Sequence, residues 1–131
     1  MKNEIRLVCV DLDGTLLKNN KTIGSKTIAA AKKAAEKGIE IVPVTGRPLS
    51  GLPQCVKVLP GVHYAVTSNG ACVTEIASGR RIYGAPLSNQ KSLQIMNLLN
   101  SHGYLFEAFA DDVGYICLLY TSDAADDLIG V

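Results

Sequence analysis

Tryptophan is absent from the 131-residue sequence, and the other large aromatics are only five tyrosines and two phenylalanines. Basic and acidic residues are nearly balanced, 13 against 12, so the formal net charge is +1. Nucleic-acid-binding domains usually carry a basic excess, and single-strand binders stack bases on aromatic side chains. The composition therefore predicts no nucleic-acid partner.

The sequence also lacks the patterns of membrane proteins and of disulfide-stabilised proteins. No apolar run approaches the roughly 20 residues of a membrane-spanning helix, and early charged residues argue against a signal peptide. The four cysteines are widely spaced, with no Cys-x-x-Cys pair: Cys9, Cys55, Cys72 and Cys117. We expect reduced, mostly buried thiols without a zinc site, no membrane association and a cytoplasmic location.

The first 70 residues instead alternate short apolar runs with helical segments. The runs, rich in Val and Ile, predict strands over residues 5–10, 39–44 and 64–66. Ser25 can cap a helix that ends at Gly38, and Pro48 begins a second helix expected to reach about Leu59. This order predicts an α/β fold with a parallel sheet whose first strand is buried on both faces.

After residue 70 the pattern changes to α+β. Two short strands around Ser78-Gly79 predict a hairpin, residues 89–102 predict an amphipathic helix, and two more strands flank Asp111-Asp112. We therefore predict a first domain over residues 1–70 and part of a second domain over residues 71–116.

Asp11-Leu12-Asp13-Gly14-Thr15 directly follows the first predicted strand. A carboxylate there can attack phosphorus, and a second one can protonate the leaving oxygen and later deprotonate water. Two acids this close repel each other unless they are neutralised, which Mg²⁺ with oxygen ligands does. An acidic turn without function and a calcium loop are the alternatives, although the glycine is misplaced for a calcium loop.

Two further clusters follow the second and third predicted strands. Thr45-Gly46-Arg47 offers a hydroxyl, backbone N–H groups and a guanidinium to a phosphate, and Asn69-Gly70 ends the third strand. Each cluster alone is equally typical of an ordinary turn. Ligands of open α/β sheets bind beyond the carboxyl ends of the strands, where all three clusters are predicted to lie.

These residues resemble the haloacid dehalogenase-like hydrolases, specifically the Cof-type sugar-phosphatase branch. The matching segments are VCVDLDGTLL, AAAKKAAEKG, IVPVTGRP and VTSNGACV, in the same order over at least residues 5–73. The resemblance implies the N-terminal half of a Rossmann-like core, followed by the first part of an α/β cap.

The resemblance also implies a role for each matching residue. Asp11 is the expected nucleophile and a Mg²⁺ ligand, and Asp13 is the expected general acid/base, which gives the metal its backbone carbonyl. Leu12, Gly14, Thr45 and Gly46 are expected to bind the phosphate. Arg47 and Asn69 are expected near the substrate pocket.

Two parts of the family's site are not found in the sequence. The family also uses a lysine on a later loop and a Gly-Asp-x-x-Asn-Asp motif that completes the metal site. Without them, we expect the 131-residue chain to have little activity alone.

Residues 117–131 are expected to be a non-native tail. Cys117 to Asp126 can be back-translated to a string that resembles a transposon-end sequencing adapter. A natural strand and polar tail that resembles it by chance is the alternative.

The expected function of the intact protein is Mg²⁺-dependent hydrolysis of phosphate monoesters, through an aspartyl-phosphate. The expected substrate is a small phosphorylated metabolite similar to a sugar phosphate. A phosphomutase with the same chemistry and a non-catalytic truncated module are the alternatives.

Overall fold

The structure, a computed structural model, describes residues 4–117. The described residues divide into two compact units, one up to Pro86 and one from Leu87 onward. The first unit extends beyond residue 70 because the hairpin that follows pairs with the parallel strands in one sheet. Apart from Cys117, the expected tail over residues 117–131 lies outside the described residues.

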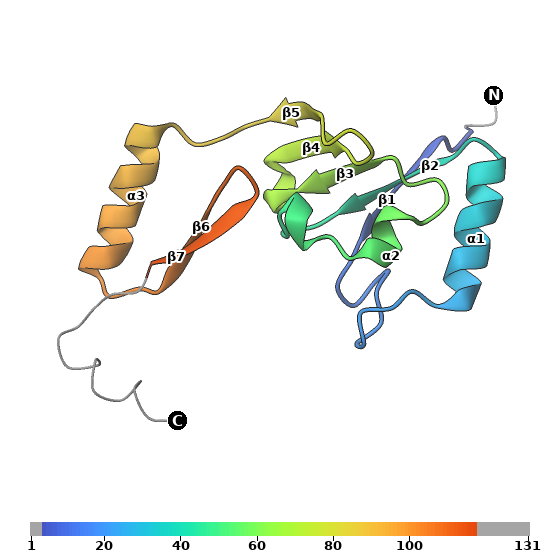
Figure 1. Cartoon of the computed structure of the whole chain (residues 1–131), viewed down its shortest axis with the longest axis horizontal. Helices are drawn as coiled ribbons and strands as arrows, with labels where there is room; N and C mark the ends of the chain where they lie inside the picture. The colour runs from blue at the N-terminus through green and yellow to red at the C-terminus, as the bar shows by residue number, and fades with distance from the viewer. Residues whose placement is uncertain (1–3, 118–131) are drawn as a thin grey trace. The chain divides into compact units, whose positions relative to one another are not determined.

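The first unit is built on a five-stranded sheet with the strand order β1-β2-β3-β4-β5 (Figure 1). Its strands are β1 (Leu7–Asp11), β2 (Glu40–Val44), β3 (Tyr64–Thr67), β4 (Cys72–Glu75) and β5 (Arg81–Gly84). The pairs β1–β2 and β2–β3 are parallel, whereas β3–β4 and β4–β5 are antiparallel. The predicted α/β class and the predicted hairpin are confirmed.

The helices of this unit differ in detail from the prediction. Helix α1 (Ser25–Glu36) packs against β2, but its N-cap is Gly24 rather than Ser25, and no side chain caps it. The single helix expected from Pro48 to about Leu59 is wrong. A 3-10 turn, η1 (Leu49–Gly51), and a short helix, α2 (Gln54–Lys57), replace it, because Pro53 lacks an N–H donor and holds the residue before it extended.

The hydrophobic core lies between residues 12 and 65. The turn after β1 contributes three leucines, α1 one alanine, α2 one valine and strands β2 and β3 one residue each, and the connecting segments supply the rest. The clustered buried residues are Leu12, Leu16, Leu17, Ile23, Ala31, Ile41, Leu52, Val56, Leu59, Val62 and Ala65. The segment that carries Asp11 and Asp13 is therefore anchored in the core by the leucines around it.

Strand β1 is more exposed than its sequence predicts. The apolar side chains of Leu7 and Val8 remain 53% and 41% exposed, so the expectation of a strand buried on both faces is wrong. Strand β1 is an edge strand of the sheet, with β2 as its only partner among the described residues. The apolar pattern of β1 predicts which side chains can be buried, but they become buried only where another part of the protein packs against them.

The thiols are also less buried than expected. Cys9, Cys55 and Cys72 are free, as predicted, but Cys9 is exposed and the other two are only partly buried. Cys9 is exposed because it lies on the edge strand β1.

The second unit contains one helix and one hairpin. Helix α3 (Asn89–Ser101) is capped by the Ser88 hydroxyl, which accepts a hydrogen bond from the Lys91 N–H. Strands β6 (Phe106–Ala110) and β7 (Val113–Cys117) pair antiparallel around a two-residue turn. Between Leu87 and Ile116, the described side chains include none that is buried. No helix within residues 4–117 is both long and apolar enough to cross a membrane.

Candidate active site

The parallel register of the first three strands brings the predicted clusters to one edge of the sheet. Asp11, the last residue of β1, pairs with Val44 of β2, and Val44 pairs with Val66 of β3. Thr45 and Thr67 follow directly in the chain, so the turns after all three strands lie at the same edge. The sequence therefore predicted this convergence correctly.

The turn after β1 folds tightly back on itself. The Asp11 carbonyl accepts a hydrogen bond from the Leu16 N–H, and the Leu12 carbonyl accepts one from the Leu17 N–H at 2.8 Å. Gly14 supplies the sharp change of direction with φ +79°, a conformation that other residues rarely adopt. The completely buried Leu12 side chain then anchors the turn between the two acidic residues.

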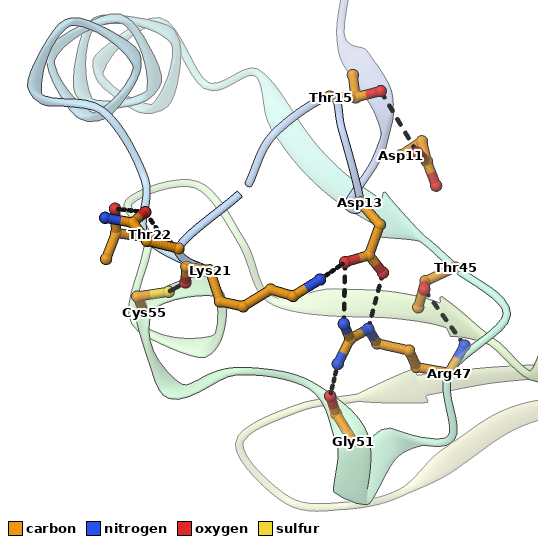
Figure 2. Close-up of polar contacts among 10 residues, drawn as sticks. Asp11, Asp13, Thr15, Lys21, Thr22, Thr45, Arg47, Gly51 and Cys55 are labelled. Atoms are coloured by element: carbon orange, nitrogen blue, oxygen red, sulfur yellow. Dashed lines mark hydrogen bonds and ion pairs between the residues drawn. The ribbon is translucent and has the colours of Figure 1, made fainter. Parts of the chain in front are cut away.

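The two acidic side chains of this turn have different partners (Figure 2). The Thr15 hydroxyl donates a hydrogen bond to Asp11 Oδ2 at 3.3 Å. Asp13 instead lies among basic groups. Two 2.9 Å contacts join Arg47 Nε to Oδ2 and Nη2 to Oδ1, and a third joins Lys21 Nζ to Oδ1 at 2.8 Å.

The contacts of Asp13 determine its charge. Hydrogen bonds from Arg47 and then from Lys21 hold the pKa of Asp13 well below the ordinary aspartate range, and the Asp13 carboxylate in turn raises the pKa of Arg47. Protein cations therefore neutralise Asp13 in this structure, a role that the sequence analysis gave to a metal ion.

Lys21 was missed by the sequence analysis. It lies in a narrow turn in which the Lys18 N–H bonds to the Thr22 carbonyl and the Asn20 side chain accepts from Thr22. The backbone of Lys21 is left-handed, with φ +60°. The Asn19-Asn20 pair, which is typical of a turn, is the signal that could have placed the next residue back towards Asp13.

Thr45 and Arg47 are held by the ends of the neighbouring strands. Thr45 is 6% exposed, its N–H bonds to the Val66 carbonyl, and its hydroxyl accepts the Arg47 N–H at 3.2 Å. Arg47 also donates from Nη1 to the Gly51 carbonyl, which directs the guanidinium towards Asp13. Thr67, at the end of β3, is fully buried, and its hydroxyl has no hydrogen-bond partner in the described part of the chain.

Asn69 lies beside the Thr45–Arg47 turn, in the 3-10 turn η2 (Ser68–Gly70). Its N–H donates to the Thr45 carbonyl at 3.2 Å, and the Ser68 N–H donates to the Arg47 carbonyl at 2.9 Å. Asn69 therefore contacts the candidate phosphate-binding turn directly. The phosphate-binding roles of Leu12, Gly14, Thr45 and Gly46 stay predictions.

The oxygen atoms at this edge of the sheet are of the type that Mg²⁺ binds in proteins. Asp11 offers a carboxylate, and Asp13 offers a backbone carbonyl, whereas both carboxylate oxygens of Asp13 are engaged by Arg47 and Lys21. Within residues 4–117, no group of three or more His, Cys, Asp or Glu side chains is close enough to hold a metal ion. Because Mg²⁺ keeps several waters and often binds one or two carboxylates together with substrate phosphate, a partial donor set fits it.

The chain matches a family model and several curated proteins. A model described as haloacid dehalogenase-like hydrolase covers residues 8–121. Among curated proteins, a Bacillus subtilis phosphatase is 26% identical over 127 residues, covering 97% of this chain and 42% of that protein. The pyridoxal phosphate phosphatase of Escherichia coli is 30% identical over 107 residues, covering 82% of this chain and 39% of that protein.

Solved structures share the fold. A haloacid dehalogenase-like hydrolase from Bacillus subtilis aligns with a TM-score of 0.75 and 27% identity, covering 86% of this chain and 39% of that one. A phosphatase of the same superfamily from Bacteroides thetaiotaomicron gives a TM-score of 0.77 at 24% identity, covering 90% and 43%. The chain spans about two fifths of the length of the relatives and structures it matches.

Proposed function

The chain belongs to the haloacid dehalogenase-like hydrolases, and from that premise we propose that it carries the nucleophile and phosphate-binding turns of a phosphate-monoester hydrolase. One observation carries the proposal. The parallel register of β1, β2 and β3 brings Asp11, the Asp13–Arg47 pair and Thr45 to a single sheet edge. A nucleophile, a proton-transfer group, a cation and a buried hydroxyl there meet the needs of phosphoryl transfer.

The proposed reaction has two steps. In the first, an Asp11 carboxylate oxygen bonds to phosphorus, the bond from phosphorus to the ester oxygen breaks, and Asp13 gives its proton to the departing alcohol. In the second, water attacks the phosphorus of the aspartyl-phosphate and loses a proton to Asp13, and Asp11 leaves as a carboxylate. Thr45 would position the transferring phosphoryl group from its place at the end of β2.

Asp13 must change protonation state between these steps. Its contacts with Arg47 and Lys21 favour the carboxylate, which is the form needed to accept a proton from water. A phosphate dianion entering the site would compete with Asp13 for both cations. Losing these partners would raise the pKa of Asp13 towards its ordinary value, which favours the protonated form needed in the first step.

The proposed cofactor is Mg²⁺. The Asp11 carboxylate and the Asp13 backbone carbonyl would hold it, together with groups beyond those described here. When bound, the ion would reduce repulsion between the Asp11 carboxylate and the phosphate oxygens.

The proposed substrate is a small phosphorylated metabolite, with a sugar phosphate as the first class to test. Similar proteins include phosphatases of pyridoxal phosphate and of 5-amino-6-(5-phospho-D-ribitylamino)uracil. We expect the phosphate of such a molecule to bind hydroxyl and cationic groups, which Thr45 and Arg47 would provide. We keep the cytoplasmic location as a prediction.

The test compares the 131-residue chain with the full-length protein from the same gene. With Mg²⁺, the full-length enzyme is expected to hydrolyse sugar phosphates and p-nitrophenyl phosphate, and Asp11→Asn to lower kcat at least about 1,000-fold. Asp13→Asn should cost more with a sugar phosphate, whose leaving oxygen needs protonation, than with p-nitrophenyl phosphate. The short chain is expected to show little turnover.

A matched control and the product distinguish the alternatives. Asp111→Asn, in the left-handed turn of the β6–β7 hairpin, is expected to leave kcat unchanged. Free phosphate as the product supports the hydrolase, whereas an isomeric sugar phosphate indicates a phosphomutase. Full activity of Asp11→Asn would contradict the proposed nucleophile.

A further inference from the structure

The turn after β3 lies against the turn after β2, with the Asn69 side chain next to Gly46. A Cβ atom added to Gly46 would lie 2.8 Å from Asn69 Oδ1 and 3.5 Å from Asn69 Cγ. Real Cβ atoms essentially never come this close to another heavy atom. The Asn69 side chain therefore fills the space that a side chain at position 46 would need.

The backbone of Gly46 does not itself require glycine. Its φ lies outside the positive range that L-residues avoid, unlike that of Gly14 or Gly70. An alanine at position 46 is therefore acceptable to the local backbone, and the Asn69 side chain, which supplies the three nearest atoms, would have to shift to admit it. This separates the contact from conformational effects at the same residue.

Backbone hydrogen bonds tie the same two turns together. The N–H groups of Ser68 and Asn69 donate to the carbonyls of Arg47 and Thr45, on either side of Gly46. To present both groups, Ser68 and Asn69 adopt left-handed conformations, with φ +51° and +56°. Such conformations cost free energy for non-glycine residues, although asparagine tolerates them best, and they persist where surrounding contacts hold them.

We propose that Asn69 is a positioning residue that fixes the Thr45–Arg47 turn by packing its side chain against Gly46. It acts through that turn on the Thr45 hydroxyl and on Arg47, and does not itself contact the reacting phosphate. This role rests on the proposed function for its effect on phosphate, but the contact between the two turns can be tested without it. It also differs from the substrate-pocket role that the resemblance implies for Asn69.

The experiment is a double-mutant cycle of Gly46→Ala and Asn69→Gly in the 131-residue chain. Asn69→Gly keeps the left-handed backbone while removing the side chain that obstructs Cβ. We expect Gly46→Ala to destabilise the chain and the double variant to recover, with a coupling of roughly tenfold in the unfolding equilibrium constant. Gly24→Ala, where the atoms nearest an added Cβ belong to the Lys18 and Thr27 side chains, is the matched control and should not respond to Asn69→Gly.

Amide chemical shifts and the affinity for inorganic phosphate both report on the conformation of the Thr45–Arg47 turn. In ¹H–¹⁵N spectra, Asn69→Gly should shift the amide resonances of Thr45, Gly46 and Arg47, and Gly46→Ala should shift those of Ser68 and Asn69. With Mg²⁺ present, Gly46→Ala should weaken the binding of inorganic phosphate by about tenfold or more, because displaced binding groups lose affinity steeply. The double variant should recover most of that loss.

Each result decides one of the two ideas. Additive effects of the two substitutions, together with unchanged Thr45–Arg47 resonances in Asn69→Gly, would overturn the positioning role. If Gly46→Ala does not fold, recovery of the folded spectrum in the double variant supports the role, and failure to recover overturns it. If the two substitutions are coupled but phosphate causes no change in the chain, the contact between the turns is supported and the proposed phosphate site is contradicted.

Discussion

The two units of the chain contain similar local elements but differ in what their side chains bury. In the first unit, a core of apolar side chains lies beneath the turns that carry Asp11 and Thr45. In the second, α3 and the β6–β7 hairpin form as their sequences predict, yet Leu93, Leu98 and Leu105 remain more than half exposed. Local sequence determines the helices and strands in both units. Only in the first unit do the described residues form a core, and that core holds the turns of Asp11 and Thr45 in place.

The largest difference between the two units is expected in the rate of amide hydrogen exchange. Amides of β2, whose Ile41 and Val42 are buried, should exchange at least about 100-fold more slowly than amides of β6, because β6 opens without disrupting a core. Native-state exchange of the 131-residue chain, followed by NMR, measures both in one sample. Equal protection in β2 and β6 would contradict the comparison.

Core substitutions should separate the units by stability. Leu52 is 4% exposed and Leu98 is 59% exposed. Leu52→Ala is expected to lower the free energy of unfolding by about 2–5 kcal/mol, and Leu98→Ala by no more than about 0.5 kcal/mol. Urea unfolding measures both variants, and similar losses at the two leucines would show that the second unit has a core of comparable strength.

The same contrast explains which parts of the fold could be predicted. Period and composition predicted the strands and the hairpin around Ser78-Gly79, because those patterns depend on neighbours in sequence. The exposure of β1 could not be predicted, since it depends on which strand lies beside it. The break at Pro53 was foreseeable, because proline in a helix interior removes a hydrogen bond.

The candidate site was predictable in its positions but not in its contacts. Strand ends placed Asp11, Thr45 and Asn69 together, because parallel strands end at the same edge. The bidentate contact between Asp13 and Arg47 spans 34 residues, and no local pattern reports it. Lys21 reaches Asp13 only because its turn folds back, and the sequence showed the turn but not its direction.

A smaller effect is expected at the buried hydroxyls of the site edge, which have no counterpart in the second unit's described residues. Thr67 Oγ1 is buried without a hydrogen-bond partner, so Thr67→Val should stabilise the chain by up to about 1 kcal/mol. Thr45→Val is the matched control. Its hydroxyl accepts the Arg47 N–H, so its loss should destabilise the chain by about 1 kcal/mol.

Chemical denaturation measures both threonine variants under one set of conditions. A loss of stability in Thr67→Val would mean that its hydroxyl has a partner outside the described contacts.

The smallest effect is expected in the acid stability of the first unit. Arg47 and Lys21 lower the pKa of Asp13 in the folded chain, so its ionised form stabilises the fold above the unfolded pKa. This contribution is lost as pH falls through the lowered pKa of the folded state. Because the pair is exposed to solvent, its effect on stability is small.

Asp13→Asn should therefore weaken the loss of thermal stability between about pH 5 and pH 2. Melting curves of the wild type and the variant across that range measure the difference, with Asp111→Asn as the control outside the cluster. An unchanged acid dependence in Asp13→Asn would show that this ion pair does not contribute.

The most direct test of the phosphate site is to locate phosphate on the 131-residue chain by ¹H–¹⁵N NMR, with Mg²⁺ and inorganic phosphate added. We expect shifts confined to the first unit, at residues 11–15 and 45–47, and their loss in Asp11→Asn. Shifts of equal size in α3 or in the β6–β7 hairpin, or an unchanged response in Asp11→Asn, would contradict the claim that the turns after β1 and β2 form the phosphate site.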